Sequence, residues 1–243
     1  MMNLSETSNL PGSGRLKYQD FLPEFVYGGI DGSVTTFAVV AGSAGADLDI
    51  SIILILGFAN LLADGFSMSV GAYLSTKTGK ENYEKHRKKE YREIQEIPES
   101  EEEEIRQIYR EKGFEGELLE KVVAVIISDK DRWVDVMMKD ELEMIPEKKS
   151  PLLIGTVTFL SFITVGLVPL ISYLFEEQAN QSSTHLFLLS CIMTSVAFVG
   201  IGFLKATVTE TSRLRGIMET LLLGGSAAAV SYFVGDILEK ILS

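Results

Sequence analysis

Residue types that commonly build metal and redox sites are almost absent from this sequence. Cysteine occurs once, as Cys191, which excludes an internal disulfide and any paired-cysteine metal or redox motif. Histidine occurs only as His86 and His185, so no histidine-rich metal site is expected. Positive charge is scarce, because 22 lysines and arginines oppose 34 acidic residues and leave a net charge of −12. A chain this acidic lacks the basic surface that nucleic acids require, so we expect no nucleic-acid partner.

Long uncharged runs, in contrast, are abundant. The mean hydropathy is positive, +0.20, although 23% of the residues are charged, so apolar and charged residues are segregated. A helix needs about 20 residues to cross a bilayer. Runs of that length lie at 25–46, 50–75, 151–175, 186–204 and 216–235. Buried helices of a soluble protein are the alternative, but soluble domains rarely need several such runs. We therefore predict an all-α integral membrane protein with five transmembrane helices.

The charges between these runs predict the orientation. Apart from Lys240, every lysine and arginine lies before the first run, in the segment 76–150, or in the region 205–215. The connections AGADLD and EEQANQSSTH carry none. Because positively charged loops stay in the cytosol, we predict a cytosolic N-terminus without a cleavable signal peptide and an external C-terminus. The predicted parts are a cytosolic tail (1–22), spans one and two (23–75), a cytosolic helical metal-binding domain (76–150) and spans three to five (151–243).

The insert between the second and third spans is acidic, carries charges of both signs and is predicted to form three helices. The first covers about 78–97. The second, about 100–113, begins with Ser100 and Glu103 at the spacing of a capping box. The third covers about 115–144, where apolar residues recur at helical spacing. Such an insert would be a small helical domain at the cytosolic membrane surface.

The first apolar run contains an acid, Asp31, among Gly28, Gly29 and Gly32. A charged side chain at the centre of a transmembrane helix costs at least about 2.5–3.5 kcal/mol on insertion scales. No predicted span contains a lysine or arginine to neutralise it. The glycines allow a kink or a close helix approach, and neighbouring hydroxyl side chains could hydrogen-bond to the acid. We predict that Asp31 is a cation or proton site; the alternative is a carboxylate that pairs with a buried group or stays protonated.

The second run carries another acid and a methionine one helical turn apart. Its stretch NLLADGFSMSVGAY places most of a polar set on one helical face, namely Asn60, Asp64, Ser67, Met68 and Gly71. A carboxylate beside a thioether is an unusual pair for Na⁺, K⁺ or Mg²⁺, which prefer oxygen ligands, and suits a borderline transition metal better. We therefore predict that Asp64 and Met68 contribute to a metal path. The alternative is that Met68 is a packing residue.

The insert offers three further sets of metal-ligand side chains. The members of each set are three or four residues apart and therefore project from one helix face. The sets are Glu90 with Glu93, Glu101 with Glu104, and Met137 and Met138 with Glu141. Three such helices could enclose metal ions with oxygen and sulfur ligands. The alternative is that these glutamates belong to solvated faces paired with lysine and arginine.

The fifth run also contains an acid, Glu219, near its cytosolic end. One interpretation is a group through which protons or metal ions reach the path. The other is a side chain that extends to the membrane interface and pairs with Arg215, four residues earlier. The sequence does not decide between the two interpretations.

Four stretches carry a family signature in a specific order. They are FVYGGIDGSVTTFAVVAG, NLLADGFSMSVGAYLS, DRWVDVMMKDELEM and GFLKATVTETSRLRGIMETLLLGGSAAAVSYFVG. These stretches resemble the vacuolar iron transporter family, which includes plant vacuolar iron transporters and the yeast Ca²⁺-sensitive cross-complementer, and the resemblance extends over almost all of 22–235. It implies a homodimer of five-helix protomers that moves Fe²⁺, often with Mn²⁺, out of the cytosol in exchange for protons. It also implies an ion path at the dimer interface, lined by the first two helices.

The resemblance assigns roles by position. Asp31 of the first helix and Met68 of the second line the path. The metal-binding residues of the insert are Glu90, Glu93, Glu101, Glu104, Met137, Met138 and Glu141. One position differs, because plant members have a glutamate eight residues before the methionine, where this chain has Asn60. We expect Asp64 to take over that role; otherwise the path has fewer charges and a different ion preference or proton coupling.

The implied partners are divalent metal ions, protons and the lipid bilayer. No permanently bound cofactor is expected, because Fe²⁺ or another divalent transition metal is the substrate. One methionine–carboxylate set accommodates Fe²⁺, Mn²⁺, Co²⁺ and Zn²⁺, so the sequence does not rank these metals. The membrane would be the cell membrane in a prokaryote, which the NLLADG variant favours, and the vacuolar membrane in a eukaryote.

Other function classes compete with a proton-coupled exporter. A channel, or an exporter of a different metal, could use the same acids. A metal sensor would bind metal in the insert while the bundle transports nothing. An enzyme is not predicted, because the sequence offers no nucleophile–base pair or nucleotide loop and the glycines of GGIDG do not follow a strand.

Overall fold

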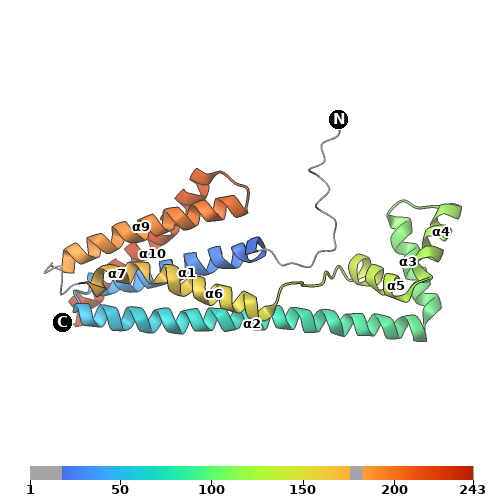
Figure 1. Ribbon diagram of the computed structural model, residues 1–243, viewed down its shortest axis with the longest axis horizontal. Coiled ribbons are helices and arrows are strands. Elements are labelled where there is room, and N and C mark those ends of the chain that lie inside the picture. The colour runs from blue at the N-terminus through green and yellow to red at the C-terminus, as the bar shows by residue number, and fades with distance from the viewer. Residues whose placement is uncertain (1–17, 176–182, 243) are drawn as a thin grey trace. The chain divides into compact units, whose positions relative to one another are not determined.

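The computed structural model describes residues 18–175 and 183–242, and the regular elements in these ranges are all helices (Figure 1). The predicted tail and the connection EEQANQSSTH lie largely outside the described residues. Two compact units divide the chain: Leu74–Lys148 forms one, and the described residues before and after it form the other. The boundary at Tyr73 and Leu74 lies within a single helix, α2, which is continuous from Ile50 to Glu96.

The first unit is a bundle of apolar helices. Its elements are η1 (Tyr18–Phe21), α1 (Leu22–Gly45), the beginning of α2, α6 (Pro151–Gly166), α7 (Val168–Leu174), α9 (Ser183–Val208) and α10 (Arg213–Leu242). Four of them, α1, α2, α9 and α10, are long and apolar enough to cross a membrane. The pair α6 and α7 adds a fifth if the two helices are one span bent by 44°. The chain is therefore a membrane protein, and the candidate spans coincide with the apolar runs of the sequence.

The bend between α6 and α7 differs from the single straight span expected for 151–175. It falls at Leu167, two residues before Pro169. Proline has no backbone N–H to continue the helical hydrogen bonds, and its ring crowds the carbonyl of the preceding turn. The proline therefore accounts for the break in an otherwise apolar helix.

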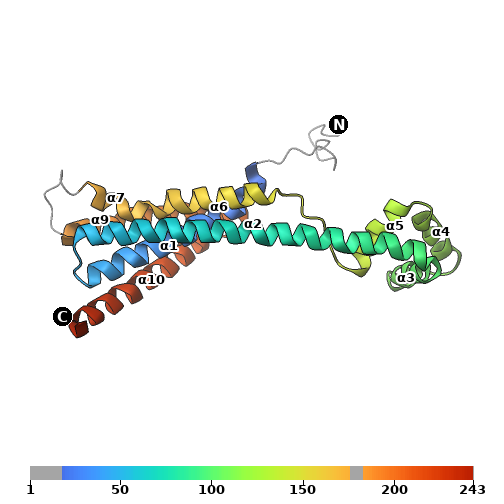
Figure 2. The same ribbon diagram turned by 90° about the horizontal axis from the view of Figure 1, so that it is seen from below.

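Helix α1 packs against α6, α9 and α10 (Figure 2). The glycines near Asp31 permit a close approach and introduce no kink, because α1 is one unbroken helix. A Cβ atom at Gly28 would lie 2.7 Å from the backbone oxygen of Thr158, and one at Gly32 would overlap the backbone of Phe162. Of the two roles predicted for these glycines, the structure shows the close approach.

The second unit contains the end of α2 followed by α3 (Pro98–Glu111), α4 (Gly116–Ile127), α5 (Lys130–Val136) and a π-helix, η2 (Met137–Glu141). One apolar core joins these segments. It consists of Ile94, Ile105, Leu119, Val123, Ile126, Trp133, Val134, Met137 and Met138.

Two details of the predicted insert are wrong. Helix α3 begins at Pro98, whose missing N–H suits the first turn of a helix, and Ser100 and Glu103 form no capping box. The predicted third helix is broken, because the Asp129 side chain accepts a hydrogen bond of 2.8 Å from the backbone N–H of Arg132 and caps a new helix there. After α5, the chain widens into η2 instead of continuing as an α-helix.

Candidate metal path and acidic cluster

The polar residues of α2 lie beside the stripe through which this helix packs in the bundle. The stripe is buried at intervals of four and consists of Ile53, Gly57, Leu61 and Gly65. Asn60 and Asp64 each precede a stripe residue, so they lie at one edge of this contact. Asp64 is exposed, whereas Asn60 and Met68 are half-buried. Met68 also contacts the apolar core of the bundle, so the packing interpretation of this side chain has support.

Asp31 and Asp64 lie at a similar level of the bundle, on two different helices. Each precedes a glycine that packs against Phe162 of α6: Gly32 against its backbone and Gly65 against its ring. The two carboxylates are close enough for their charges to interact. In the part of the chain that the structure describes, neither carboxylate has a hydrogen bond or an ion pair. Both acids are therefore available to bind a cation or a proton.

Asp31 borders an open groove of about 630 Å³ between α1 and α10. The rest of the lining is apolar or small: Ile30, Val34, Leu223, Ser226, Ala227, Val230, Ser231 and Val234. The hydroxyl of Thr35 donates to the backbone oxygen of Asp31 at 2.9 Å and not to the carboxylate. On α2, the amide nitrogen Nδ2 of Asn60 is buried without a hydrogen-bond partner in the described structure. Asp31 thus combines an unpaired carboxylate with an apolar wall, and Asn60 is a second unpaired polar group, on α2.

In the second unit, the predicted glutamates gather around one place. Glu90 and Glu93 lie on α2, Glu101 and Glu104 on α3, and Glu141 in η2. Their charges act on one another across these three segments. The spacing of each pair on its helix face is what directs the side chains toward a common region.

Burial perturbs two of these acids strongly. Glu90 and Glu101 are only 2% and 3% exposed. Burial, followed by the charges of Glu141 and Glu93, raises the pKa of Glu90 to about 7. Burial, followed by the charges of Glu104 and Glu90, raises the pKa of Glu101 to about 7. One carboxylate oxygen of each, Oε2, is buried without a hydrogen-bond partner among the described residues, which is a place for a cation or a proton.

The two methionines of the insert are part of its core. Met137 and Met138 are 0% and 1% exposed and pack among apolar side chains. They also lie in η2, where the backbone N–H of Leu142 reaches the oxygen of Met137 at 3.1 Å. Single π-helical turns are rare and occur frequently at functional sites. No pattern in the sequence predicted this widened turn.

The acidic cluster is not a preformed coordination shell. Within residues 18–175 and 183–242, no three histidine, cysteine or acidic side chains stand close enough together to hold a metal ion. Like-charged carboxylates repel one another when no cation lies between them. The cluster thus consists of converging acids that would have to draw closer around a metal.

Glu219 lies outside both groups. It accepts hydrogen bonds from Lys205 on α9 at 2.8 Å and from Arg215 on α10 at 2.9 Å. Glu219 therefore pairs with Arg215, as one of the two interpretations of the sequence predicted, and it also pairs with Lys205. The two ion pairs join the end of α9 to the beginning of α10.

Residues 22–236 match the family model of the VIT family. The chain belongs to the VIT family. It is 33% identical over 229 residues to the vacuolar iron transporter of Toxoplasma gondii (strain ATCC 50861 / VEG), covering 92% of this chain and 76% of that protein. It is 30% identical over 223 residues to vacuolar iron transporter 1 of Tulipa gesneriana, covering 91% and 89% of the two chains. It is 28% identical over 221 residues to vacuolar iron transporter 1 of Arabidopsis thaliana, covering 90% and 87%.

This membership confirms the resemblance inferred from the four stretches. The VIT family is a family of transporters, so this VIT-family chain is not an enzyme, and metal-ion transport is its function class. Sequence reasoning missed the polar contacts that join the helices of the insert, among them Tyr91 with Asp131 and Lys112 with Asp140. Partners so far apart in the chain leave no periodic pattern that would reveal them.

Proposed function

We propose that this VIT-family protein exports Fe²⁺, with Mn²⁺ as a second substrate, from the cytosol across its membrane in exchange for protons. The observation that carries the proposal is the gathering of Glu90, Glu93, Glu101, Glu104 and Glu141 around one region of the insert. The names of the relatives support iron as the metal. The membrane is vacuolar if the source is eukaryotic and the cell membrane if it is prokaryotic.

The acidic cluster loads the metal. A pKa of about 7 leaves Glu90 and Glu101 partly protonated in a neutral cytosol. An arriving divalent cation displaces those protons, because a carboxylate oxygen that faces the metal cannot also hold a proton. The thioethers of Met137 and Met138 are soft ligands that suit Fe²⁺ better than Mg²⁺ or Ca²⁺. The cluster therefore selects transition metals where alkaline-earth ions are more abundant.

The membrane path uses Asp31, Asp64, Met68 and the side-chain oxygen of Asn60. In a homodimer with a two-fold axis, two copies of Asp31 approach a single path, and their repulsion is relieved by a cation or by shared protons. Exchange of metal for protons follows, because the same carboxylates hold either a metal cation or protons. Asp64 supplies the negative charge that Asn60 lacks, and this charge interacts electrostatically with Asp31.

The five-span topology and the cytosolic insert complete the proposal. The bent pair α6 and α7 counts as one span, which gives an odd number of crossings and places the two termini on opposite sides. The side of the insert rests on the distribution of lysine and arginine and stays a prediction of the charge pattern. Glu219 contributes to this arrangement as an ion-pair partner of Lys205 and Arg215.

A flux measurement on purified protein in liposomes tests the proposal. Fe²⁺ supplied on the side of the insert should enter faster when the lumen is acidic, and an imposed Fe²⁺ gradient should move protons outward. A channel would pass Fe²⁺ at the same rate with and without the pH gradient. A sensor would show no flux at all, although the insert would bind metal. Repeating the measurement with Mn²⁺, Co²⁺ and Zn²⁺ ranks the substrates.

A further inference from the structure

The segment formed by α5 and η2 carries one side of the acidic cluster. It contributes Glu141 directly and positions Met137 and Met138 beside it. Its second half is a π-helix, whose widened turn is seldom stable by itself and depends on its surroundings. The contacts that hold this segment therefore decide where Glu141 lies relative to the glutamates of α2 and α3.

One polar contact holds the beginning of the segment. The hydroxyl of Tyr91 on α2 donates to a carboxylate oxygen of Asp131 in the first turn of α5. The guanidinium of Arg87 in turn donates to the Tyr91 hydroxyl at 3.4 Å and lies 5.5 Å from the centroid of its ring. Tyr91 directly follows Glu90, so this contact connects α5 to α2 next to a buried acid of the cluster.

A second polar contact holds the end of the segment. The ammonium of Lys112, at the C-cap of α3, pairs with Asp140 in η2 at 2.5 Å. The same ammonium lies 4.7 Å from the centroid of the Tyr109 ring, which restricts the lysine further. The Asp140 side chain is only 18% exposed, and it directly precedes Glu141. This contact connects η2 to the helix that carries Glu101 and Glu104.

We propose that Tyr91 and Lys112 are positioning residues for metal loading: they hold the two ends of the α5–η2 segment so that Glu141 faces the glutamates of α2 and α3. The proposal rests on the proposed function, because it assumes that the cluster binds the metal. Neither residue contacts the metal. Each acts through an aspartate of the segment: Tyr91 through Asp131 at its beginning, and Lys112 through Asp140, which directly precedes Glu141.

Holding both ends restricts the segment's sliding and its rotation. Without the contacts, metal binding would have to order the segment, and the lost conformational freedom would appear as weaker affinity. The fold of the insert would survive, because the apolar core around Trp133, Met137 and Met138 does not depend on either contact. Weaker metal affinity with an intact core is therefore the expected signature of lost positioning.

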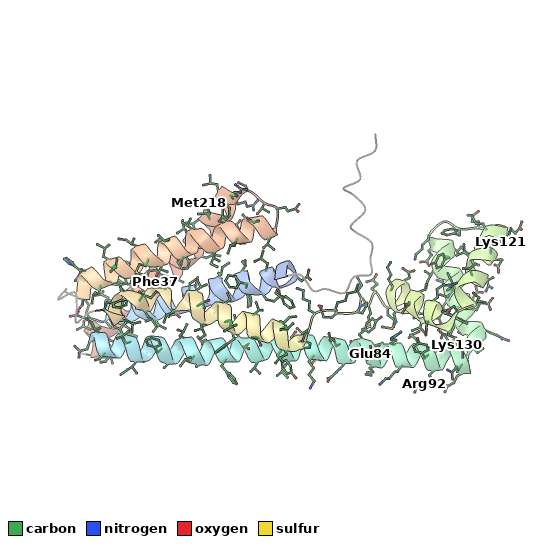
Figure 3. The ribbon with its side chains drawn as sticks, in the orientation of Figure 1. Phe37, Glu84, Arg92, Lys121, Lys130 and Met218 are labelled. Carbon is green, nitrogen blue, oxygen red and sulfur yellow. The ribbon has the colours of Figure 1, made fainter. Side chains whose placement is uncertain are left out.

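Charge alone predicts the opposite result for Lys112. Removing a cation near a cluster of acids should strengthen the binding of a metal cation. Lys121 offers a matched control on α4, where it is exposed and pairs with Glu117 at 2.7 Å on the same helix (Figure 3). The variant Lys121→Met loses the same charge without loosening η2.

The experiment titrates the purified full-length protein with Mn²⁺ and follows the fluorescence of Trp133, the only tryptophan of the chain. Tyr91→Phe and Lys112→Met should each raise the Kd for Mn²⁺ about 10-fold, the lower end of the effect of residues that orient metal ligands. Lys112→Arg should restore most of the affinity, and Lys121→Met should bind as the unchanged protein does. Equilibrium dialysis checks the Kd independently of fluorescence.

Each unexpected result of the Mn²⁺ titration has its own interpretation. If the unchanged protein binds Mn²⁺ and both variants bind it equally well, the positioning role is overturned while the cluster stands. A tighter Kd for Lys112→Met overturns it too, in favour of a purely electrostatic role. A lower affinity accompanied by a red-shifted Trp133 emission in the metal-free variants means that the core has opened, and this also overturns the proposal. If the unchanged protein binds no Mn²⁺ at its insert, the proposed function of the cluster fails first.

Discussion

Glu90 and Glu101 face conflicting requirements. Their burial favours the neutral form, whereas metal binding requires the charged form. A pKa of about 7 means that both forms are populated near neutral pH. The two residues can therefore release protons when a metal arrives and take protons up again when it leaves.

Metal binding should consequently weaken as the pH falls through about 7. We expect the Kd for Mn²⁺ to rise between pH 8 and pH 6, with protons released on binding, as measured by titration calorimetry in two buffers of different ionisation enthalpy. Glu90→Gln should bind Mn²⁺ more weakly and release fewer protons. Glu96→Gln, an exposed position on the same helix, should behave as the unchanged protein. An unchanged Kd across this pH range would contradict the assignment.

The same pKa shifts predict how stability depends on pH in the metal-free protein. The folded state holds the protons of Glu90 and Glu101 more tightly than the unfolded chain, whose glutamates titrate near 4.5. The free energy of unfolding of the insert should therefore be highest below that pH and should fall as the pH rises to about 7. Thermal unfolding monitored through Trp133 measures this. A stability that rises over this range would contradict the burial of both acids.

Among the helices, the contact of α1 with α6 determines the position of Asp31 along the bundle. Gly32→Ala places a methyl group against the backbone of Phe162, so we expect a loss of about 1–3 kcal/mol in unfolding free energy from overpacking. Gly200→Ala on α9 is the control, because a Cβ atom there meets no atom within 4 Å. Thermal unfolding in detergent compares the two variants. Equal midpoints would show that α1 and α6 do not pack this closely.

The helices also show which structural features can be predicted from the sequence. Apolar runs are sufficient to locate the candidate spans, because length and hydropathy are properties of a single segment. The spacing of Glu90 with Glu93 and of Glu101 with Glu104 is likewise local, and the structure brings both pairs together. The π-turn η2 depends on contacts between helices, and no local pattern encodes it. The break before α5 had a local signal in Asp129, a good N-cap residue, which periodicity alone overlooked.

At the scale of the whole molecule, the two units separate two tasks. In the proposed transport, the acids of unit 74–148 attract and load the cation, whereas the apolar runs of the bundle contain only three charged residues, Asp31, Asp64 and Glu219. The proposed export needs both units, because the first would raise the local metal concentration and the second would carry the metal across the lipid. In this proposal, Asp31 binds the cation as it crosses the bundle.

Uptake of Fe²⁺ into liposomes with an acidic lumen tests this role of Asp31. We compare the unchanged protein with Asp31→Asn and with Asp47→Asn, whose exposed acid follows the end of α1. We expect Asp31→Asn to fall to the rate of protein-free liposomes and Asp47→Asn to keep the rate of the unchanged protein. Uptake by Asp31→Asn at that same full rate would show that Asp31 does not carry the cation.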